Sequence, residues 1–221
     1  MSPPARPHEC MSQKLLSSGV KNFQNSHVVY TNDKANWIHL DLYHRGSVDN
    51  GATWSTPSQI ARLEKAQLKE SEDRDTLVLF SSVAADGANV HVFYTAPSDY
   101  FWSSYNLYSK SSIDNGLTWS TTKQLTFSNQ IRAITPKATA VNGTNVYVVY
   151  ADFTTQDIYF KKSTDSGTTW PAPTRLTYIS TLNNYGYPSM VYSPGTGYFH
   201  IISGFDVDLT YRGELYYKRG H

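Results

Sequence analysis

Apolar and polar residues alternate along several short stretches of the chain, which is the pattern of half-buried β-strands. Three of these stretches each follow a turn that contains Gly: Val90–Tyr94, Val146–Tyr150 and Tyr198–Ile202. A second set lies further along each unit: Trp37–Tyr43, Asn106–Lys110, Asp157–Lys161 and Glu214–Lys218. No segment sustains a long apolar period of 3.6 residues, so the pattern predicts an all-β chain.

A pattern of eight residues, Ser-x-Asp-x-Gly-x-x-Trp, follows three strands of the second set. Its Asp residues are 65 and 51 positions apart (114 − 49 and 165 − 114), a spacing that indicates a propeller or a solenoid. We expect Asp to accept hydrogen bonds from the backbone of its own turn, Gly to supply a positive φ, and Trp to anchor the turn by packing. The residues are Ser47, Asp49, Gly51, Trp54, Ser112, Asp114, Gly116, Trp119, Ser163, Asp165, Gly167 and Trp170. Because the Asp residues lie in separate units, we expect them to be structural, with no metal site and no cofactor.

Each unit holds four predicted strands, because a short outer strand follows the Trp and ends near Gln124–Thr126 or Arg175–Thr177. Four antiparallel strands make a propeller blade, and the chain has room for about four blades. The last unit lacks an outer strand, and Gln13–Leu16 resembles Lys123–Thr126. We therefore expect residues 1–12 to be a flexible leader and residues 13–221 to be one propeller domain, with the N-terminal strand closing the last blade.

Composition and charge exclude several classes of protein. The formal net charge is +1 and charged residues make up 17% of the chain, which argues against a nucleic-acid partner. No apolar run approaches the roughly 18 residues that a membrane span needs. The single Cys10 forms no intrachain disulfide, and Met1–Gln13 lacks the apolar core of a secretory signal, so the sequence leaves the compartment unknown.

The eight-residue patterns resemble the Asp box of the bacterial neuraminidase repeat, which occurs in sialidases and many other β-propeller proteins. The resemblance covers most of residues 14–221. It implies that the Asp boxes lie on the face away from a sialidase-type active site. Sialidases usually have six blades, so this chain either closes as a smaller ring or belongs to a homo-oligomer or larger assembly.

The opposite face of such a propeller carries the loops between the second and third strands and the loops between blades, where binding residues are expected. Aromatic rings stack on sugars, Asn reads hydroxyls, and Arg pairs with carboxylates. Alternatively, several of these aromatic residues pack between blades. The predicted ligand-binding residues are Arg74, Arg132, Arg212, Trp102, Tyr105, Tyr185 and Asn184.

The resemblance to sialidases also implies a catalytic set, in which three arginines hold the substrate carboxylate. Tyr187 is then the nucleophile, an exception to the usual pair of carboxylates. Its base is Glu72 or Glu70, and the acid/base is Asp152, Asp33 or Asp206. The sequence departs from the family pattern after Tyr187, where Pro188 follows.

The sequence as a whole predicts a sialidase-like propeller that recognises glycans through its aromatic and Arg/Asn-rich loop face. Two other hypotheses stay open. One is an exo-α-sialidase or related glycoside hydrolase, and the other is a scaffold that binds protein.

Overall fold

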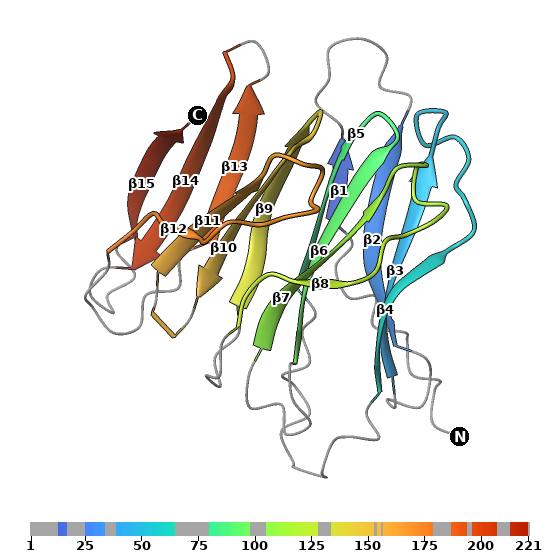
Figure 1. The fold of residues 1–221 in the computed structure, drawn as a ribbon, viewed down its shortest axis with the longest axis horizontal. Helices are drawn as coiled ribbons and strands as arrows, with labels where there is room; N and C mark the ends of the chain where they lie inside the picture. Colours follow the sequence, from blue (N-terminus) through green and yellow to red (C-terminus); the bar gives the residue numbers. More distant parts are fainter. Residues whose placement is uncertain are drawn as a thin grey trace, which may run out of the picture.

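The computed structural model describes residues 13–16, 25–33, 39–64, 80–97, 105–127, 134–152, 154–155, 157–178, 187–193, 196–206 and 213–220. Within these residues all regular structure is β-strand, arranged in four antiparallel sheets that lie side by side (Figure 1). Because propeller blades are sheets of this kind, the structure confirms an all-β propeller fold of about four blades.

Each sheet consists of strands that are consecutive in the chain. The first contains β1 (Gln13–Leu16), β2 (Ser26–Asp33), β3 (His39–Ser47) and β4 (Ser58–Glu64). The second contains β5 (Ser81–Asp86), β6 (Asn89–Pro97), β7 (Tyr105–Ser112) and β8 (Lys123–Gln124). The third contains β9 (Ile134–Asn142), β10 (Asn145–Asp152), β11 (Asp157–Ser163) and β12 (Thr174–Arg175). The fourth contains β13 (Tyr187–Ser193), β14 (Tyr198–Asp206) and β15 (Gly213–Gly220).

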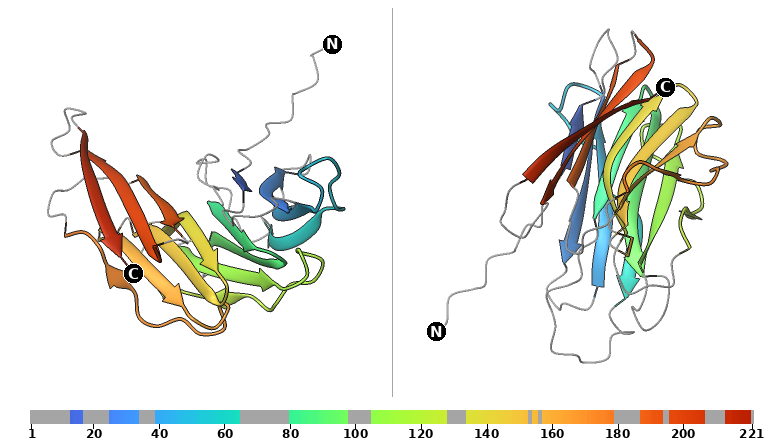
Figure 2. Two further views of the ribbon diagram at one scale, coloured as in Figure 1. Left: turned by 90° about the horizontal axis from the view of Figure 1, so that it is seen from above. Right: turned by 90° about the vertical axis from the view of Figure 1, so that its left-hand side faces the viewer.

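The N-terminal strand does not close the last blade, and that prediction is wrong. β1 instead pairs antiparallel with β2, with Gln13 opposite Val29 and Leu16 opposite Ser26. A short connection brings these two strands together at a lower entropic cost than pairing across the whole chain. The four sheets form an open arc with the first and fourth sheets at its two ends, so β1 and β15 lie far apart (Figure 2).

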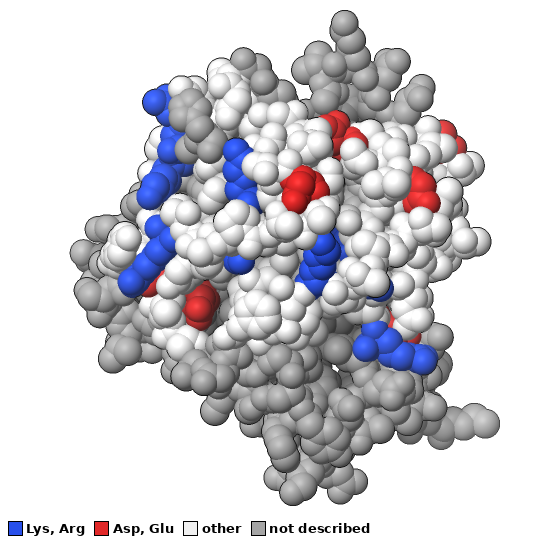
Figure 3. All heavy atoms as spheres, in the orientation of Figure 1, with Lys and Arg blue, Asp and Glu red and all other residues white. Residues whose placement is uncertain are grey.

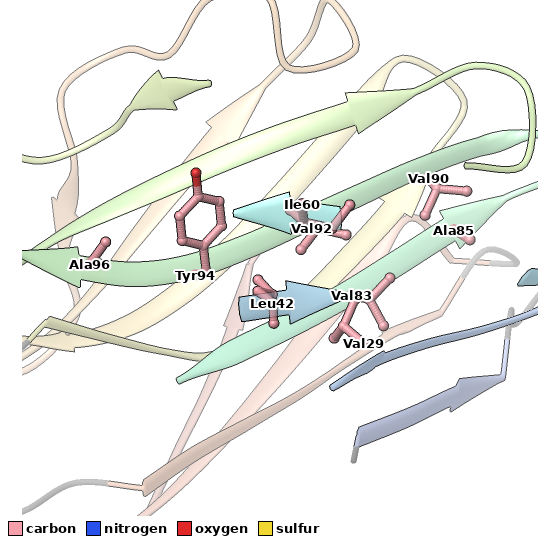
Figure 4. Close-up of a cluster of buried hydrophobic side chains, with 9 residues drawn as sticks. All are labelled: Val29, Leu42, Ile60, Val83, Ala85, Val90, Val92, Tyr94 and Ala96. Atoms are coloured by element: carbon pink, nitrogen blue, oxygen red, sulfur yellow. The ribbon is translucent and has the colours of Figure 1, made fainter. Parts of the chain in front are cut away.

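The hydrophobic core lies between adjacent sheets. We call the side that a sheet turns toward the next sheet its rear face, and the opposite side its front face. Figure 4 shows the cluster at the first junction, where the rear face of the first sheet meets the front face of the second. Its buried members are Val29, Leu42, Ile60, Val83, Ala85, Val90, Val92, Tyr94 and Ala96.

Equivalent clusters fill the second and third junctions. Phe93, Leu107 and Leu125 of the second sheet meet the front face of the third sheet, whose contribution is Val146, Val148 and Tyr150. The rear face of the third sheet meets the fourth through Tyr147, Val149, Ile158, Leu176, Tyr192, Phe199 and Ile201. A middle sheet is therefore covered on both faces, which is why its second strand is buried at every position from Val146 to Ala151.

The three Ser-x-Asp-x-Gly-x-x-Trp segments, which we call the octapeptide turns, have the hydrogen bonds that their sequence predicts. In the second turn, Asp114 Oδ1 accepts the Thr118 N–H at 2.9 Å and the Ser112 hydroxyl at 2.7 Å. The Gly116 N–H donates to Ser112 Oγ at 2.8 Å, and Gly116 has a φ of +83°. Hydrogen bonds from Ser112 and Thr118 lower the pKa of Asp114 to about 2. The first and third turns repeat this arrangement, so the Asp residues hold the turns together.

The second and third octapeptide turns also pack on the preceding sheet. The Trp119 ring meets His44 edge-on at 5.0 Å, and its Nε1–H donates to Ser58 Oγ at 3.0 Å. Trp170 meets Phe93 edge-on at 5.7 Å. Figure 1 shows both turns reaching back over the sheet before their own. Each of these turns thus joins two blades.

Candidate functional site

A groove of about 520 Å³ lies between the second and third sheets, near their outer strands. The second sheet contributes the segment that follows β8, Leu125–Phe127. The third sheet contributes residues of β10, β11 and the segment after the third octapeptide turn. These are Tyr150, Asp152, Thr154, Tyr159, Lys161, Trp170, Pro171, Ala172 and Pro173.

The walls of the groove are largely aromatic. The pairing of β10 with β11 sets Tyr150 opposite Tyr159, and their rings stack at 5.7 Å. Alternation along β10 places Val148, Tyr150 and Asp152 on the front face, so the groove begins where the apolar junction ends. Phe127 is 83% exposed although it is a lining residue, which presents an open ring face to solvent. Such a surface is suited to stacking against a flat apolar patch of a ligand.

The polar groups of the groove come from β10, β11 and the loop between them. Asp152 Oδ1 accepts the Thr154 N–H at 2.8 Å. The buried Lys161 donates from Nζ to the Pro171 carbonyl at 3.0 Å, and burial lowers its pKa. Burial, and then the negative charge of Asp152, raise the pKa of Tyr150. A carboxylate, an ammonium group and hydroxyls are therefore available to bind a polyhydroxylated ligand.

A buried ion pair supports the neighbouring segment of the third sheet. The Asp157 side chain is fully buried and pairs with Arg175, and it also accepts the Thr177 hydroxyl at 2.9 Å. In the second sheet the equivalent residues are neutral: Asn106 accepts the Thr126 hydroxyl at 2.9 Å, and Gln124 stands where Arg175 does. The charged pair of the third sheet is therefore replaced by two neutral residues at the equivalent positions of the second sheet.

An exposed aromatic residue follows this Thr in both sheets. Phe127 comes after Thr126, and Tyr178, which is 78% exposed, comes after Thr177. The Arg175 guanidinium lies 4.6 Å from the centre of the Tyr178 ring. The outer ends of the second and third blades thus each present one aromatic ring to solvent.

The structure brings one predicted site residue, Asp152, into the groove. Tyr105 is the first residue of β7, where its backbone pairs with Pro97. Tyr187 is the first residue of β13 and pairs with Gly204. The remaining predicted site residues lie outside the described residues: Glu72, Arg74, Trp102, Arg132, Asn184, Tyr185 and Arg212.

Sequence reasoning missed most of the groove. The tyrosine pair was detectable, because Tyr150 and Tyr159 repeat the stacked pair Tyr94 and Tyr108 of the second sheet. Phe127 was detectable too, because Leu-Thr-aromatic occurs at the same place in two units. Lys161 gave no signal, because a strand lysine is usually exposed and only packing shows that this one is buried.

Acidic and basic side chains are interspersed over the face of the molecule shown in Figure 3. The described residues contain no cluster of three or more His, Cys, Asp or Glu side chains that could hold a metal ion. Nor do they include a helix long and apolar enough to cross a membrane.

Comparison of the fold with solved structures finds carbohydrate-active enzymes. An α-L-arabinofuranosidase from Fusarium graminearum aligns with a TM-score of 0.60 and 15% identity over 95% of this chain and 61% of its own. An α-L-arabinanase from Penicillium chrysogenum aligns with a TM-score of 0.57 and 15% identity over 90% of this chain and 61% of its own. A sialidase from Streptococcus pneumoniae aligns with a TM-score of 0.51 and 10% identity over 86% of this chain and 27% of its own.

At this identity the likeness shows the fold alone. The chain spans 61% of the length of the arabinanase and the arabinofuranosidase. No protein-family model matches the sequence, and no curated protein matches it.

Proposed function

We propose that this chain recognises carbohydrate through the groove between its second and third sheets. The observation that carries the proposal is the combination of four aromatic rings with one carboxylate and one ammonium group in a single groove of about 520 Å³. A volume of that order suits a small ligand site. Aromatic rings can cover the apolar face of a sugar while Asp152, Thr154 and Lys161 bind its hydroxyls.

The similar structures support this proposal. The fungal arabinanase structure is a complex with arabinobiose, and the fungal arabinofuranosidase structure is a complex with an iminosugar inhibitor. The third enzyme is a sialidase. We also propose that the three octapeptides are Asp boxes of the neuraminidase repeat, because their hydrogen bonds are the same in all three copies.

Calorimetric titration with arabino-oligosaccharides and sialyl-oligosaccharides tests the proposed groove. Phe127→Ala should weaken binding of the responding sugar about tenfold, because it removes an exposed stacking surface. Asp152→Asn should weaken it by a similar factor through the loss of a charged acceptor. Ile113→Ala is the matched control, since Ile113 is 76% exposed and does not line the groove. Equal affinity in all four proteins, or no binding of either sugar class, would contradict the proposal.

Hydrolysis of a glycoside is the second candidate function. It is favoured by the position of Asp152, a carboxylate in the groove and the predicted acid/base. A fluorogenic arabinofuranoside and a fluorogenic sialoside test for turnover. If the sialidase-type set is correct, Tyr187→Phe abolishes release from the sialoside and Asp152→Asn slows it at least about a hundredfold. Binding without turnover of either substrate leaves recognition as the function.

A further inference from the structure

The four sheets repeat one another residue by residue, and the strand register defines the equivalent positions. Ser26, Val90 and Val146 lie opposite the octapeptide serines of their own sheets. Phe199 lies opposite Gly220, the equivalent position of the fourth sheet. The residue three positions after each of these four lies on the rear face of its sheet. These equivalent residues are Val29, Phe93, Val149 and Ile202.

This position is covered in three sheets and open in the fourth. Val29, Phe93 and Val149 are each 0% exposed, because the next sheet packs on them, whereas Ile202 is 44% exposed. Two further exposed residues of this rear face have large apolar parts, Tyr217 at 55% and Val191 at 60%. Ser189, His200 and Arg219 lie on the same face. The fourth sheet therefore carries the apolar surface of a sheet–sheet junction without a sheet on it among the described residues.

The other end of the arc has the complementary surface. Val92 and Tyr94 of the second sheet, and Val148 and Tyr150 of the third, are buried against the preceding sheet. The equivalent residues of the first sheet are Val28 and Tyr30, which are only partly buried. Tyr30 stacks on Tyr43 at 5.8 Å, as the tyrosine pairs of the second and third sheets do.

Within the described part of the chain, the first octapeptide turn likewise lacks the contact with a neighbouring sheet that the other two make. The Trp of the second turn packs on His44, and that of the third on Phe93. A Cβ added to Gly167 of the third turn would lie 3.5 Å from His91 Nδ1, so this turn rests closely on the second sheet. A Cβ added to Gly51 of the first turn would meet, among the described residues, only Trp54 within 4 Å.

We propose that the occupant of the fourth sheet's rear face is the first sheet of a second copy of this chain. The junction continues the three that already exist within the chain, and it uses only surfaces that the chain itself supplies. By equivalence with Trp170 and Phe93, Trp54 of one copy packs on Ile202 of the other. By equivalence with Gly167 and His91, Gly51 packs over His200.

We call the front face of the first sheet, around Val28 and Tyr30, the head, and the rear face of the fourth sheet, around Ile202, the tail. The proposed contact joins the head of one copy to the tail of the other, and each copy has one of each. Figure 2 shows the first and fourth sheets, which carry the two surfaces, at opposite ends of an open arc. In the proposed assembly two copies make the contact twice. Two equal junctions then close a ring, since a heterologous contact closes whenever its rotation allows. The expected assembly is a dimer whose eight sheets leave neither rear nor front face uncovered.

Light scattering coupled to size-exclusion chromatography tests the assembly on the full chain. The expected mass is twice the 24.9 kDa of one chain. Ile202→Asp blocks the tail and Val28→Asp blocks the head, and each should weaken self-association at least about a hundredfold by burying an unpaired charge. Ile113→Asp places the same charge on an exposed apolar residue outside both surfaces and should leave the dimer intact. Circular dichroism and thermal melts identify any variant that has lost its fold.

A mixture of the two blocked variants separates this contact from other dimers. Val28→Asp keeps an intact tail, and Ile202→Asp keeps an intact head. Neither variant can form the junction with itself, but a mixture can form one junction between these two intact surfaces. A heterodimer should therefore appear only on mixing. The proposal is overturned by a wild-type chain that stays at 24.9 kDa at its highest soluble concentration, by a dimer that survives both folded variants, or by a mixture that stays monomeric.

Discussion

At the scale of single residues, the buried histidines beside the octapeptide turns have the most unusual environment. His27 Nδ1 and His44 Nε2 lie 3.0 Å apart, and both rings are almost completely buried. Burial lowers the pKa of His27 to about 4; burial and the neighbouring His27 lower the pKa of His44 to about 3. One neutral ring can donate and the other accept, whereas two protonated rings can only donate and would repel each other. Burial also lowers the pKa of His91 to about 4.

These histidines predict a loss of stability in mild acid. In the unfolded chain they titrate near their usual pKa of about 6.5, so between roughly pH 6.5 and pH 4 the unfolded state binds more protons than the folded state. The free energy of unfolding should therefore keep its full value above pH 6.5 and decrease as the pH falls below 6.5. The decrease is up to about 1.4 kcal/mol per pH unit for each histidine. Urea titrations at several pH values measure this slope. His91→Leu should make the slope shallower, and stability that is constant from pH 7 to pH 4.5 would contradict the account.

At the scale of the elements, the second and third sheets share one plan: four strands, of which the outer one is short, and a turn that reaches the preceding sheet. β8 and β12 are each two residues long, so the outer strand contributes few backbone hydrogen bonds. The outer segments are held instead by side-chain bonds at the start of the third strand. In the third sheet the Ile158 N–H donates to Thr177 Oγ1 at 2.9 Å, and in the second the Leu107 N–H donates to Thr126 Oγ1 at the same distance.

The paired exchange of Asp157 and Arg175 for Asn106 and Gln124 predicts strong coupling between the two positions. Arg175→Gln alone should cost about 3 kcal/mol of stability, because it leaves a buried carboxylate without its cation. Asp157→Asn alone should cost about 1 kcal/mol, since the Arg175 side chain is 39% exposed and stays hydrated. The double variant should be more stable than Arg175→Gln, because it recreates the neutral arrangement of the second sheet. A double-mutant cycle by chemical denaturation measures the coupling, and additive costs would contradict the pairing.

At the scale of the whole molecule, the four sheets form a row in which the apolar clusters join neighbours in the chain. Each junction has its own buried cluster. Stability in such an array is a sum of sheet terms and nearest-neighbour terms, as in other repeat proteins. A destabilising substitution in a sheet at one end of the row should therefore increase local unfolding at that end more than at the other.

Two core substitutions test this locality. Ile201→Ala opens the junction between the third and fourth sheets, and Val92→Ala opens the one between the first and second. Each removes fully buried methyl groups, at a cost of about 1 to 4 kcal/mol. Hydrogen exchange measured by mass spectrometry should accelerate in β13–β15 for Ile201→Ala and in β2–β7 for Val92→Ala. An equal acceleration throughout the chain in both variants would mean that the sheets unfold as one unit.

The candidate site was predictable only in part. Asp152 was singled out because it lies in a predicted loop of the binding face and the resemblance to sialidases implies an acid/base there, and the groove does contain it. Phe127 and Tyr159 were not singled out, because a residue is recognised as lining a groove only when the residues opposite it are known. The residues opposite Phe127 belong to another blade, and the ring that stacks on Tyr159 belongs to another strand. The predicted arginines, with Trp102, Tyr185, Asn184 and Glu72, stay predictions.

The sequence by itself determined the strands, the octapeptide turns and the blade, because all three depend on contacts that are local in the chain. Alternation sets which side chains share a face, and Asp114 binds atoms only two to four residues away. Only the tertiary structure decided the partner of β1, the groove, and the open rear face around Ile202. These depend on which sheet lies beside which. Equivalent residues such as Val149 and Ile202 look alike in the sequence and differ only in whether another sheet covers them.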